Sequence, residues 1–349
     1  MKPDSVATEA DGDSNELLRN RIEAEAIMTQ GMVRELSPGT LPDLEKKLLS
    51  ANLTPGWFKR EKPLVWKEMA SEMVPAHWSY RAAREHMVEA GRMLSTEQAE
   101  RRNFIMRNPV SGNDISTLRT IICAYQTVLP GERAMSHRHA PHAMRVLLES
   151  KGAYSIVNGE KHPMESGDIV LTPGGCWHGH GHEGSEQAFW VDGLDVPLTH
   201  LLEPMYYHPH PDKWEAVSSV VTDSPMRFAW ADTQRLLVHA APDVDGYFGT
   251  GIDLPTPSMP TLALRVSKWP KGWSNRPFRH TANTVYVVMQ GAGKSAIGDQ
   301  VFDWEFGDTF VAPGWTRISH EVFEDAVICV ISDEHLMRWT KYYRFESME

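Results

Sequence analysis

Two stretches decide the fold: residues 131–139 read GERAMSHRH, and residues 167–180 read GDIVLTPGGCWHGH. His137 and His139 are spaced i, i+2, so on a β-strand both imidazoles point to the same face. His178 follows a Gly-Asp turn and another apolar strand, and a rolled sheet can bring it beside the first two histidines. Three imidazoles on one concave wall would form a metal site with open coordination positions.

Composition and charge limit the class of protein. The chain has 349 residues, enough for two domains or one large duplicated domain, with 41% hydrophobic and 23% charged residues. A net charge of −11 without a Lys/Arg-rich tract argues against a nucleic-acid partner. No apolar run reaches the roughly 18 residues of a membrane helix. The N-terminus is too polar for a signal peptide, and the three scattered cysteines favour a reducing cytoplasm.

The first hundred residues have helical patterns. Apolar spacing predicts helices at residues 15–36, 41–51 and 80–94, and residues 62–78 are expected to be extended without regular structure. Ser95, with Gln98 three residues later, is typical of a capping box. Residues 1–102 are therefore predicted to form a helical N-terminal arm.

The sequence pattern of the rest of the chain predicts an all-β core. Short apolar runs separated by Gly, Pro, Asn and Asp are typical of a β-sandwich or barrel. The second set of runs repeats the first at an offset of 140 or 141 residues, since residues 307–313 parallel residues 167–173. We expect a metal-binding β domain at 103–197, a connecting region at 198–258, a second β domain at 259–335 and a tail at 336–349.

These stretches contain the two motifs of the cupin superfamily. The first motif is Gly131 followed by His137 and His139, and the second runs from Gly167 through Pro173 and Gly175 to His178. The chain further resembles the bicupin gentisate and salicylate 1,2-dioxygenases. The resembling stretches are Ala99–Arg102, Asn108-Pro109, Pro130–Glu132, residues 137–139, Thr172–Gly174, His178–His180, Trp190–Asp195 and Phe302–Trp304 with Gly307-Asp308. The resemblance implies a bicupin, two double-stranded β-helix (jelly-roll) barrels behind the helical arm.

The two copies differ at the ligand positions. Many cupins carry a Glu three or four residues after the HxH pair, but Ala143 and Met144 stand there, which leaves three histidines as ligands. In the second copy the three positions hold Phe278, His280 and Ile318. One ligand of three remains, so we expect no metal in the second barrel.

The resemblance also implies a cofactor and a reaction. Imidazole ligands alone do not choose among Fe, Zn, Ni, Cu and Mn, whereas the family implies Fe(II). The implied substrates are O2 and an aromatic acid with a hydroxyl ortho to its carboxyl, and the ring is cleaved between the carbons that bear those groups in an extradiol-type reaction. The family further implies a homo-oligomer, a tetramer.

Candidate substrate-binding residues lie around the three histidines. Arg145 follows His137 and His139 at even spacing, so a regular strand would turn it to the same cavity, where its guanidinium could hold a carboxylate. His180, two residues after His178, faces inward by the same rule. In the family the counterparts of Arg145 and Gln126 contact the carboxylate, and that of His180 acts as an acid/base or orienting group.

Further residues are expected to shape the pocket. Asp192 is expected to close its far end, and either Arg101 or Arg102 to supply a second cation. Ile122 and Ala124 alternate with Gln126 and are expected to face the cavity. These residues leave open whether the substrate is gentisate, salicylate, a 5-substituted salicylate or 1-hydroxy-2-naphthoate.

Two alternative functions compete with a ring-cleaving dioxygenase, and three further histidines are assigned to the surface. The alternative function is a non-oxygenase metal cupin, an isomerase or hydrolase that uses Zn, Mn or Ni; a regulatory ligand-binding cupin lacks support because no DNA-binding helix pair or basic surface accompanies the β domains. His142, His162 and His182 are expected at the surface.

Overall fold

The computed structural model describes residues 40–57 and 64–348, so the helix expected at residues 15–36 lies outside the described residues. The chain divides into two compact units, residues 1–67 and residues 68–349. In the first unit, α2 (Leu41–Ser50) has a proline in its first turn, where a missing N–H costs nothing. None of the helices in the described part of the chain is both long and apolar enough to cross a membrane.

The second unit begins with the remaining N-terminal elements. They are β1 (Ala76–Trp78), α3 (Tyr80–Met93) and α4 (Thr96–Ala99). The hydroxyl of Ser79 accepts a hydrogen bond from the backbone N–H of Ala82 and so caps α3. The side chain of Gln98 accepts from the backbone N–H of Ser95 at 3.1 Å, as the capping box predicts.

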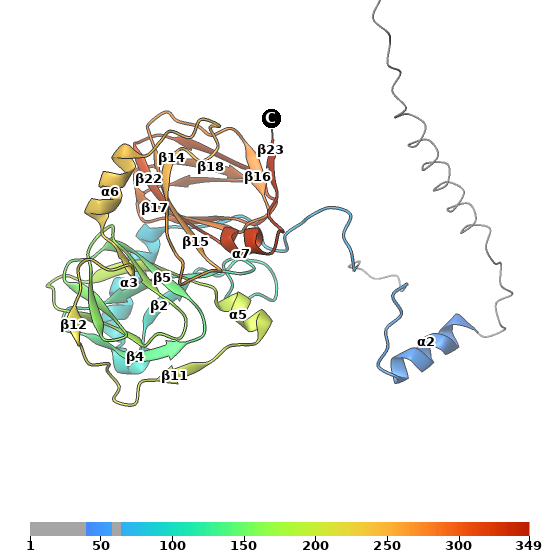
Figure 1. Cartoon of the computed structure of the whole chain (residues 1–349), viewed down its shortest axis with the longest axis horizontal. Coiled ribbons are helices and arrows are strands. Elements are labelled where there is room, and N and C mark those ends of the chain that lie inside the picture. Colours follow the sequence, from blue (N-terminus) through green and yellow to red (C-terminus); the bar gives the residue numbers. More distant parts are fainter. Residues whose placement is uncertain (1–39, 58–63, 349) are drawn as a thin grey trace, which may run out of the picture. The chain divides into compact units, whose positions relative to one another are not determined.

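The first barrel consists of two six-stranded sheets, in the orders β13-β8-β5-β10-β3-β2 and β11-β4-β9-β6-β7-β12. Figure 1 labels β2, β4, β5, β11 and β12 in this barrel. Its strands are β2 (Arg102–Ile105), β3 (Ile122–Val128), β4 (Arg133–His139), β5 (Ala143–Glu149), β6 (Ala153–Val157), β7 (Glu160–Met164), β8 (Ile169–Thr172), β9 (His178–His182), β10 (Ala188–Leu194), β11 (Tyr207–Pro209), β12 (Ser219–Val220) and β13 (Arg227–Phe228). Helix α5 (Val196–Leu202) follows β10, and α6 (Trp230–His239) follows β13.

The second barrel has sheets in the orders β1-β20-β17-β22-β15-β14 and β19-β18-β21-β16-β23. Its remaining elements are β14 (Thr250–Leu254), β15 (Ala263–Trp269), β16 (Phe278–His280), β17 (Thr284–Gln290), β18 (Gly293–Ile297), β19 (Gln300–Trp304), β20 (Thr309–Ala312), β21 (Ile318–Val322), β22 (Ala326–Ser332), α7 (Glu334–Trp339) and β23 (Phe345–Ser347). The run β8-β5-β10-β3 matches β20-β17-β22-β15, and β4-β9-β6-β7 matches β16-β21-β18-β19. The duplication expected from the sequence is therefore present strand for strand.

Several edge strands lie outside the predicted β regions. β1 lies in the stretch expected to lack regular structure, and it pairs with β20 of the second barrel. The connecting region adds β11, β12 and β13 to the first barrel and β14 to the second, and the tail adds β23. These strands have two to five residues, and all of them except β14 pair with partners far away in the sequence, so local patterns do not predict them.

The two Gly-Asp turns anchor one helix each. Gly167 and Gly307 have φ near +86° and +84°, and a Cβ there would lie 2.5 Å or less from the ring of Trp230 or Tyr80. The Asp that follows each glycine accepts the backbone N–H of that aromatic residue at 2.8 Å. Because Trp230 begins α6 and Tyr80 begins α3, each barrel fixes the start of a helix from elsewhere in the chain.

One apolar core joins the barrels. Tyr125, Met144 and Val191 of the first barrel belong to the same buried cluster as Val287 and Ile331 of the second. Continuous burial of apolar surface across both barrels explains why they form one compact unit.

Candidate metal centre and active site

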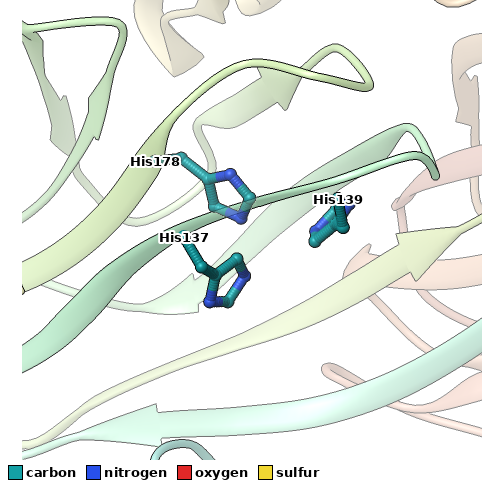
Figure 2. Close-up of side chains that lie close together, drawn as sticks. All are labelled: His137, His139 and His178. Carbon is teal, nitrogen blue, oxygen red and sulfur yellow. The ribbon is translucent and has the colours of Figure 1, made fainter. Parts of the chain in front are cut away.

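Strands β4 and β9 bring three histidines together inside the first barrel. His137 pairs directly with His178, and His139 lies two residues further along β4. The ring centroids are 4.5–5.3 Å apart, and one ligand atom from each ring lies within 4.8 Å of the others. Figure 2 shows the three rings turned toward a common point. The sequence-based grouping of these residues therefore matches their positions.

Hydrogen bonds fix the tautomer of each ring. Nδ1 of His139 lies 2.9 Å from the carbonyl of Pro141, and Nδ1 of His178 lies 3.1 Å from the carbonyl of Cys176. A carbonyl oxygen only accepts, so Nδ1 carries the proton and Nε2 keeps its lone pair. Nε2 of His178 is buried and has no hydrogen-bond partner. This is the arrangement that a metal bound by three imidazoles requires, so the residues fit a metal ion.

The third ring is held by a side chain. Nδ1 of His137 lies 3.2 Å from Oε1 of Glu100, which also accepts the hydroxyl of Tyr207 at 2.5 Å. Glu100 directly precedes the cavity residue Arg101 and has φ +52°, a left-handed conformation that costs a non-glycine residue energy. Neither Glu100 nor Tyr207 was singled out from the sequence, because nothing local places either residue beside His137.

Burial keeps the three rings neutral. Removal from water, together with the nearby guanidinium groups of Arg145 and Arg101, lowers the pKa of His137 to about 2 and that of His139 to about 4. The pKa of His178 falls well below its ordinary value, chiefly through burial. Neutral imidazoles are the protonation state that ligates metals.

A cavity of about 340 Å³ opens beside the histidines. Its lining includes all three histidines and residues from the N-terminal segment, β2, β3, β5, β10 and β11: Ala99, Glu100, Arg101, Asn103, Gln126, Arg145, Asp192, Leu194 and Tyr207. A volume of this size is within the range of small-molecule sites.

Arg145 is the fully buried cation of this cavity. Its Nη1 donates to the hydroxyl of Thr172 at 2.6 Å, and its Nε lies 3.5 Å from Oδ1 of Asp192, the residue paired with it on β10. Asp192 also accepts the indole N–H of Trp190 at 3.0 Å. Burial lowers the pKa of Arg145 only to about 10, so the guanidinium remains charged at neutral pH.

The structure separates the two candidate arginines. Arg101 lines the cavity, and its Nη2 lies 3.5 Å from Nε2 of His137. Arg102 points away and forms a buried ion pair with Glu132, in which Nη1 lies 3.0 Å from Oε1. The second cation at the site is therefore Arg101.

The remaining predicted residues have mixed positions. Gln126 is buried and lines the cavity. His180 is buried on β9 with both ring nitrogens unpartnered, its centroid 6.3 Å from that of His178, but it is not part of the cavity lining. Ile122 and Ala124 are buried on β3 and also lie outside the cavity lining. Leu194, which pairs with Ile122, lines the cavity instead.

The prediction that three other histidines lie at the surface was wrong for two of them. His162 is fully buried, and His182 is buried with Nε2 against the carbonyl of Glu186. His182 lies on β9, every residue of which is buried, whereas β7 alternates and His162 lies on its buried face. The short polar sequences of these strands do not indicate this burial. His142 is half-buried, and its Nδ1 accepts the backbone N–H of Gly174 at 2.9 Å.

Comparisons with known proteins agree with this site. The family model of the cupin domain matches residues 124–196. A 5-aminosalicylate 1,2-dioxygenase of Comamonas sp is 32% identical, over 87% of this chain and 89% of that relative. A gentisate 1,2-dioxygenase of Ralstonia sp is 31% identical, over 79% of this chain and 85% of that relative.

The fold comparison gives the same result. A solved salicylate 1,2-dioxygenase of Pseudaminobacter salicylatoxidans superimposes with a TM-score of 0.81 at 24% identity, over 89% of this chain and 98% of that one. The predicted bicupin fold is thereby confirmed. The chain belongs to the family of cupin ring-cleaving 1,2-dioxygenases that includes the gentisate and 5-aminosalicylate enzymes.

Proposed function

We propose that this dioxygenase uses Fe(II) to open the ring of a hydroxybenzoate between the carboxyl-bearing carbon and the adjacent hydroxyl-bearing carbon. The substrate class is gentisate, salicylate or a 5-substituted salicylate. One observation carries the proposal: the buried guanidinium of Arg145 and the three histidines line one cavity of about 340 Å³. The names of the relatives support this reading over an isomerase or hydrolase.

His137, His139 and His178 would hold the iron through Nε2. Bound Fe(II) would supply open coordination positions for an ortho-hydroxy acid and for O2. The other side chains that line the cavity would orient the anionic substrate.

Arg145 would bind the carboxylate. A guanidinium can hold a carboxylate with two parallel hydrogen bonds, and a buried charge gains from an anionic partner that enters the same cavity. Asp192 on β10 and Thr172 on β8 hold Arg145 from the two strands that flank β5. The amide of Gln126 would donate to the same carboxylate from β3.

His180 would act on the ring hydroxyl or orient the second substrate. Burial and the charge of Arg145 lower its pKa well below the ordinary value, so one ring nitrogen donates and the other accepts. Arg101 would supply the second positive charge beside His137. A contact of Ile122 or Ala124 with the substrate stays a prediction.

Glu100 would position His137 without touching the substrate's reacting atoms. Two of the ligands donate to backbone carbonyls, but His137 donates to a carboxylate, which raises ligand basicity. Tyr207 holds that carboxylate in place and lies over the ring of His137 at 4.8 Å.

Oxygen uptake tests the proposal. Protein purified and loaded with Fe(II) without air would be given salicylate, gentisate and 5-substituted salicylates, with benzoate as the control that lacks the ortho hydroxyl. We expect O2 consumption coupled to ring opening for at least one hydroxy acid and none for benzoate. Retention of Zn, Mn or Ni with no O2 uptake on any acid would favour the alternative function. The tetramer and the cytoplasmic location stay predictions.

A further inference from the structure

The second barrel has a cavity of its own. Its volume is about 400 Å³, against about 340 Å³ for the cavity beside the histidines. It is lined by residues of β14–β17, β21, β22 and α7, and so lies where the metal centre lies in the first barrel. Two of the three metal ligands are replaced here, but a cavity is retained.

The register of the strands identifies the replacements. Phe278 pairs with Ile318 as His137 pairs with His178. Tyr286 pairs with Val330 as Arg145 pairs with Asp192. Apart from His280, the positions that would hold a metal and a carboxylate in the first barrel therefore carry aromatic and aliphatic side chains in the second.

The walls of this cavity are aromatic. Trp269 stacks on His320 with centroids 4.6 Å apart and an interplanar angle of 27°, and Phe278 stacks on His280 at 5.6 Å and 12°. Tyr286 packs edge-on against His320 at 5.1 Å. Flat rings arranged in this way present faces and edges to another ring.

The cavity offers a hydrogen-bond donor where the first barrel offers a lone pair. Nδ1 of His280 accepts the backbone N–H of Ala282 at 3.2 Å, so Nε2 carries the proton, 3.4 Å from the hydroxyl of Thr284. The hydroxyls of Thr284 and Ser332 add groups that can donate or accept. A ligand with one hydroxyl would find partners at this end of the cavity.

The cations at the cavity are already neutralised. Arg265 is paired with Asp253 at 2.9 Å, and Arg338 with Glu334 at 2.6 Å. Both described Arg side chains of the lining therefore have a carboxylate oxygen within 2.9 Å, closer than the 3.5 Å between Arg145 and Asp192 in the first barrel. Bringing an anion into this aromatic space would therefore cost desolvation without a compensating ion pair.

We propose that the second barrel is a binding site for a small uncharged aromatic molecule that carries a hydroxyl group, a phenol. The ring packs against Trp269, Phe278 and Tyr286 in the cavity wall, and the hydroxyl meets His280 and Thr284. This site is separate from the metal centre and does not depend on the proposed substrate of the first barrel.

Titration with phenol tests the site. Phenol is uncharged at pH 7 because, like tyrosine, it has a pKa of about 10. Calorimetry and the fluorescence of the metal-loaded protein would follow binding of phenol, with benzoate as the anionic comparison. We expect a saturable site for phenol that benzoate does not compete for. Absence of saturable binding, or equal competition by benzoate, would overturn the proposal.

Variants separate this site from the first barrel. Val330→Phe fills the cavity, and Val330→Asp restores the charge that the first barrel has at this position. We expect each to weaken phenol binding at least about tenfold, while His178→Ala leaves it unchanged. A folded Val330→Phe protein that binds phenol normally, or loss of binding in His178→Ala, would contradict the proposal.

Crystals soaked with 4-iodophenol give an answer that does not depend on a variant's folding. The anomalous signal of iodine should lie in the second-barrel cavity that Trp269 and Tyr286 line. Iodine found in the first barrel alone, or at no defined position, would overturn the assignment. Because neither readout uses catalytic turnover, failure here would leave the proposed dioxygenase function untouched.

Discussion

The two barrels share strand order and pairing register but differ in which polar atoms they leave free. In the first barrel, Nδ1 of His139 faces a carbonyl, so Nε2 has its lone pair available. In the second, Nδ1 of the counterpart His280 faces a backbone N–H, so Nε2 is a donor. A duplicated scaffold thus gives a metal ligand in one copy and a hydrogen-bond donor in the other, because of one local contact.

The charges follow the same division. Arg145 and Asp192 lie paired in the first barrel, and Tyr286 and Val330 occupy the equivalent pair in the second. The retained cavity shows that the scaffold does not need these charges to fold. These charges are not needed at this position for a barrel to form, which supports the proposed role of Arg145 in ligand binding.

The largest expected effect comes from removal of a metal ligand. His178→Ala deletes the ring whose buried Nε2 has no other partner, so the protein should lose its iron and all O2 uptake. Metal analysis by mass spectrometry, with the folded state checked by circular dichroism, measures this. Arg138→Ala, on the same sheet but between two ligands and stacked on Trp177, is the matched control and should keep its metal. Iron retained by folded His178→Ala protein would show that the site lies elsewhere.

Arg145→Ala should leave the metal in place and damage substrate binding. Loss of the buried guanidinium should lower kcat/KM by about 100-fold, roughly 3 kcal/mol, with KM raised and kcat lowered as carboxylate positioning is lost. Steady-state kinetics with the best hydroxy acid measure the two constants. Arg145→Lys keeps the charge but not the planar fork and should fall in between. Unchanged kcat/KM in Arg145→Ala would refute the role.

Glu100→Ala should act on the metal and not on the carboxylate. Removing the acceptor of His137 should weaken metal affinity by about tenfold to 100-fold. Competition with a chelator measures the affinity without using activity. Glu100→Gln keeps an acceptor and should have a smaller effect, and Tyr207→Phe a smaller effect still. If Glu100→Ala protein bound the metal as tightly as the native protein, the proposed role of Glu100 in positioning His137 would be refuted.

The smallest expected effect is a failure to gain function. Phe278→His with Ile318→His restores three histidines to the second barrel, but His280 still accepts the N–H of Ala282 and presents a protonated Nε2. The double variant should bind no more than the one metal per chain of the native protein, as measured by metal content. A second tightly bound metal would show that ligand identity alone, without the tautomer, is sufficient.

The sequence predicted the metal centre because its information is local. Even spacing on β4 and β9 and the Gly-Asp turns fix where His137, His139 and His178 point. Choosing between Arg101 and Arg102 was not possible, because the choice depends on Glu132, which lies across the barrel wall. Local rules hold within a strand and fail where the deciding partner is distant in sequence.

The burial of His182 and the position of Ile122 outside the cavity were not predicted, for a similar reason. His182 was expected at the surface, but its strand is enclosed and a backbone carbonyl satisfies its ring. Ile122 has the parity of Gln126 on β3, yet the cavity ends before reaching it. Parity gives the face of a strand, whereas the end of a cavity depends on how distant elements such as β10 and β11 close over it.

The most direct test of the central claim is a crystal structure of the iron-loaded protein with salicylate, collected at the iron absorption edge. We predict one anomalous peak per chain, beside Nε2 of His137, His139 and His178, with the carboxylate of salicylate contacting Arg145. An iron peak in the second barrel, or a carboxylate bound away from Arg145, would contradict it.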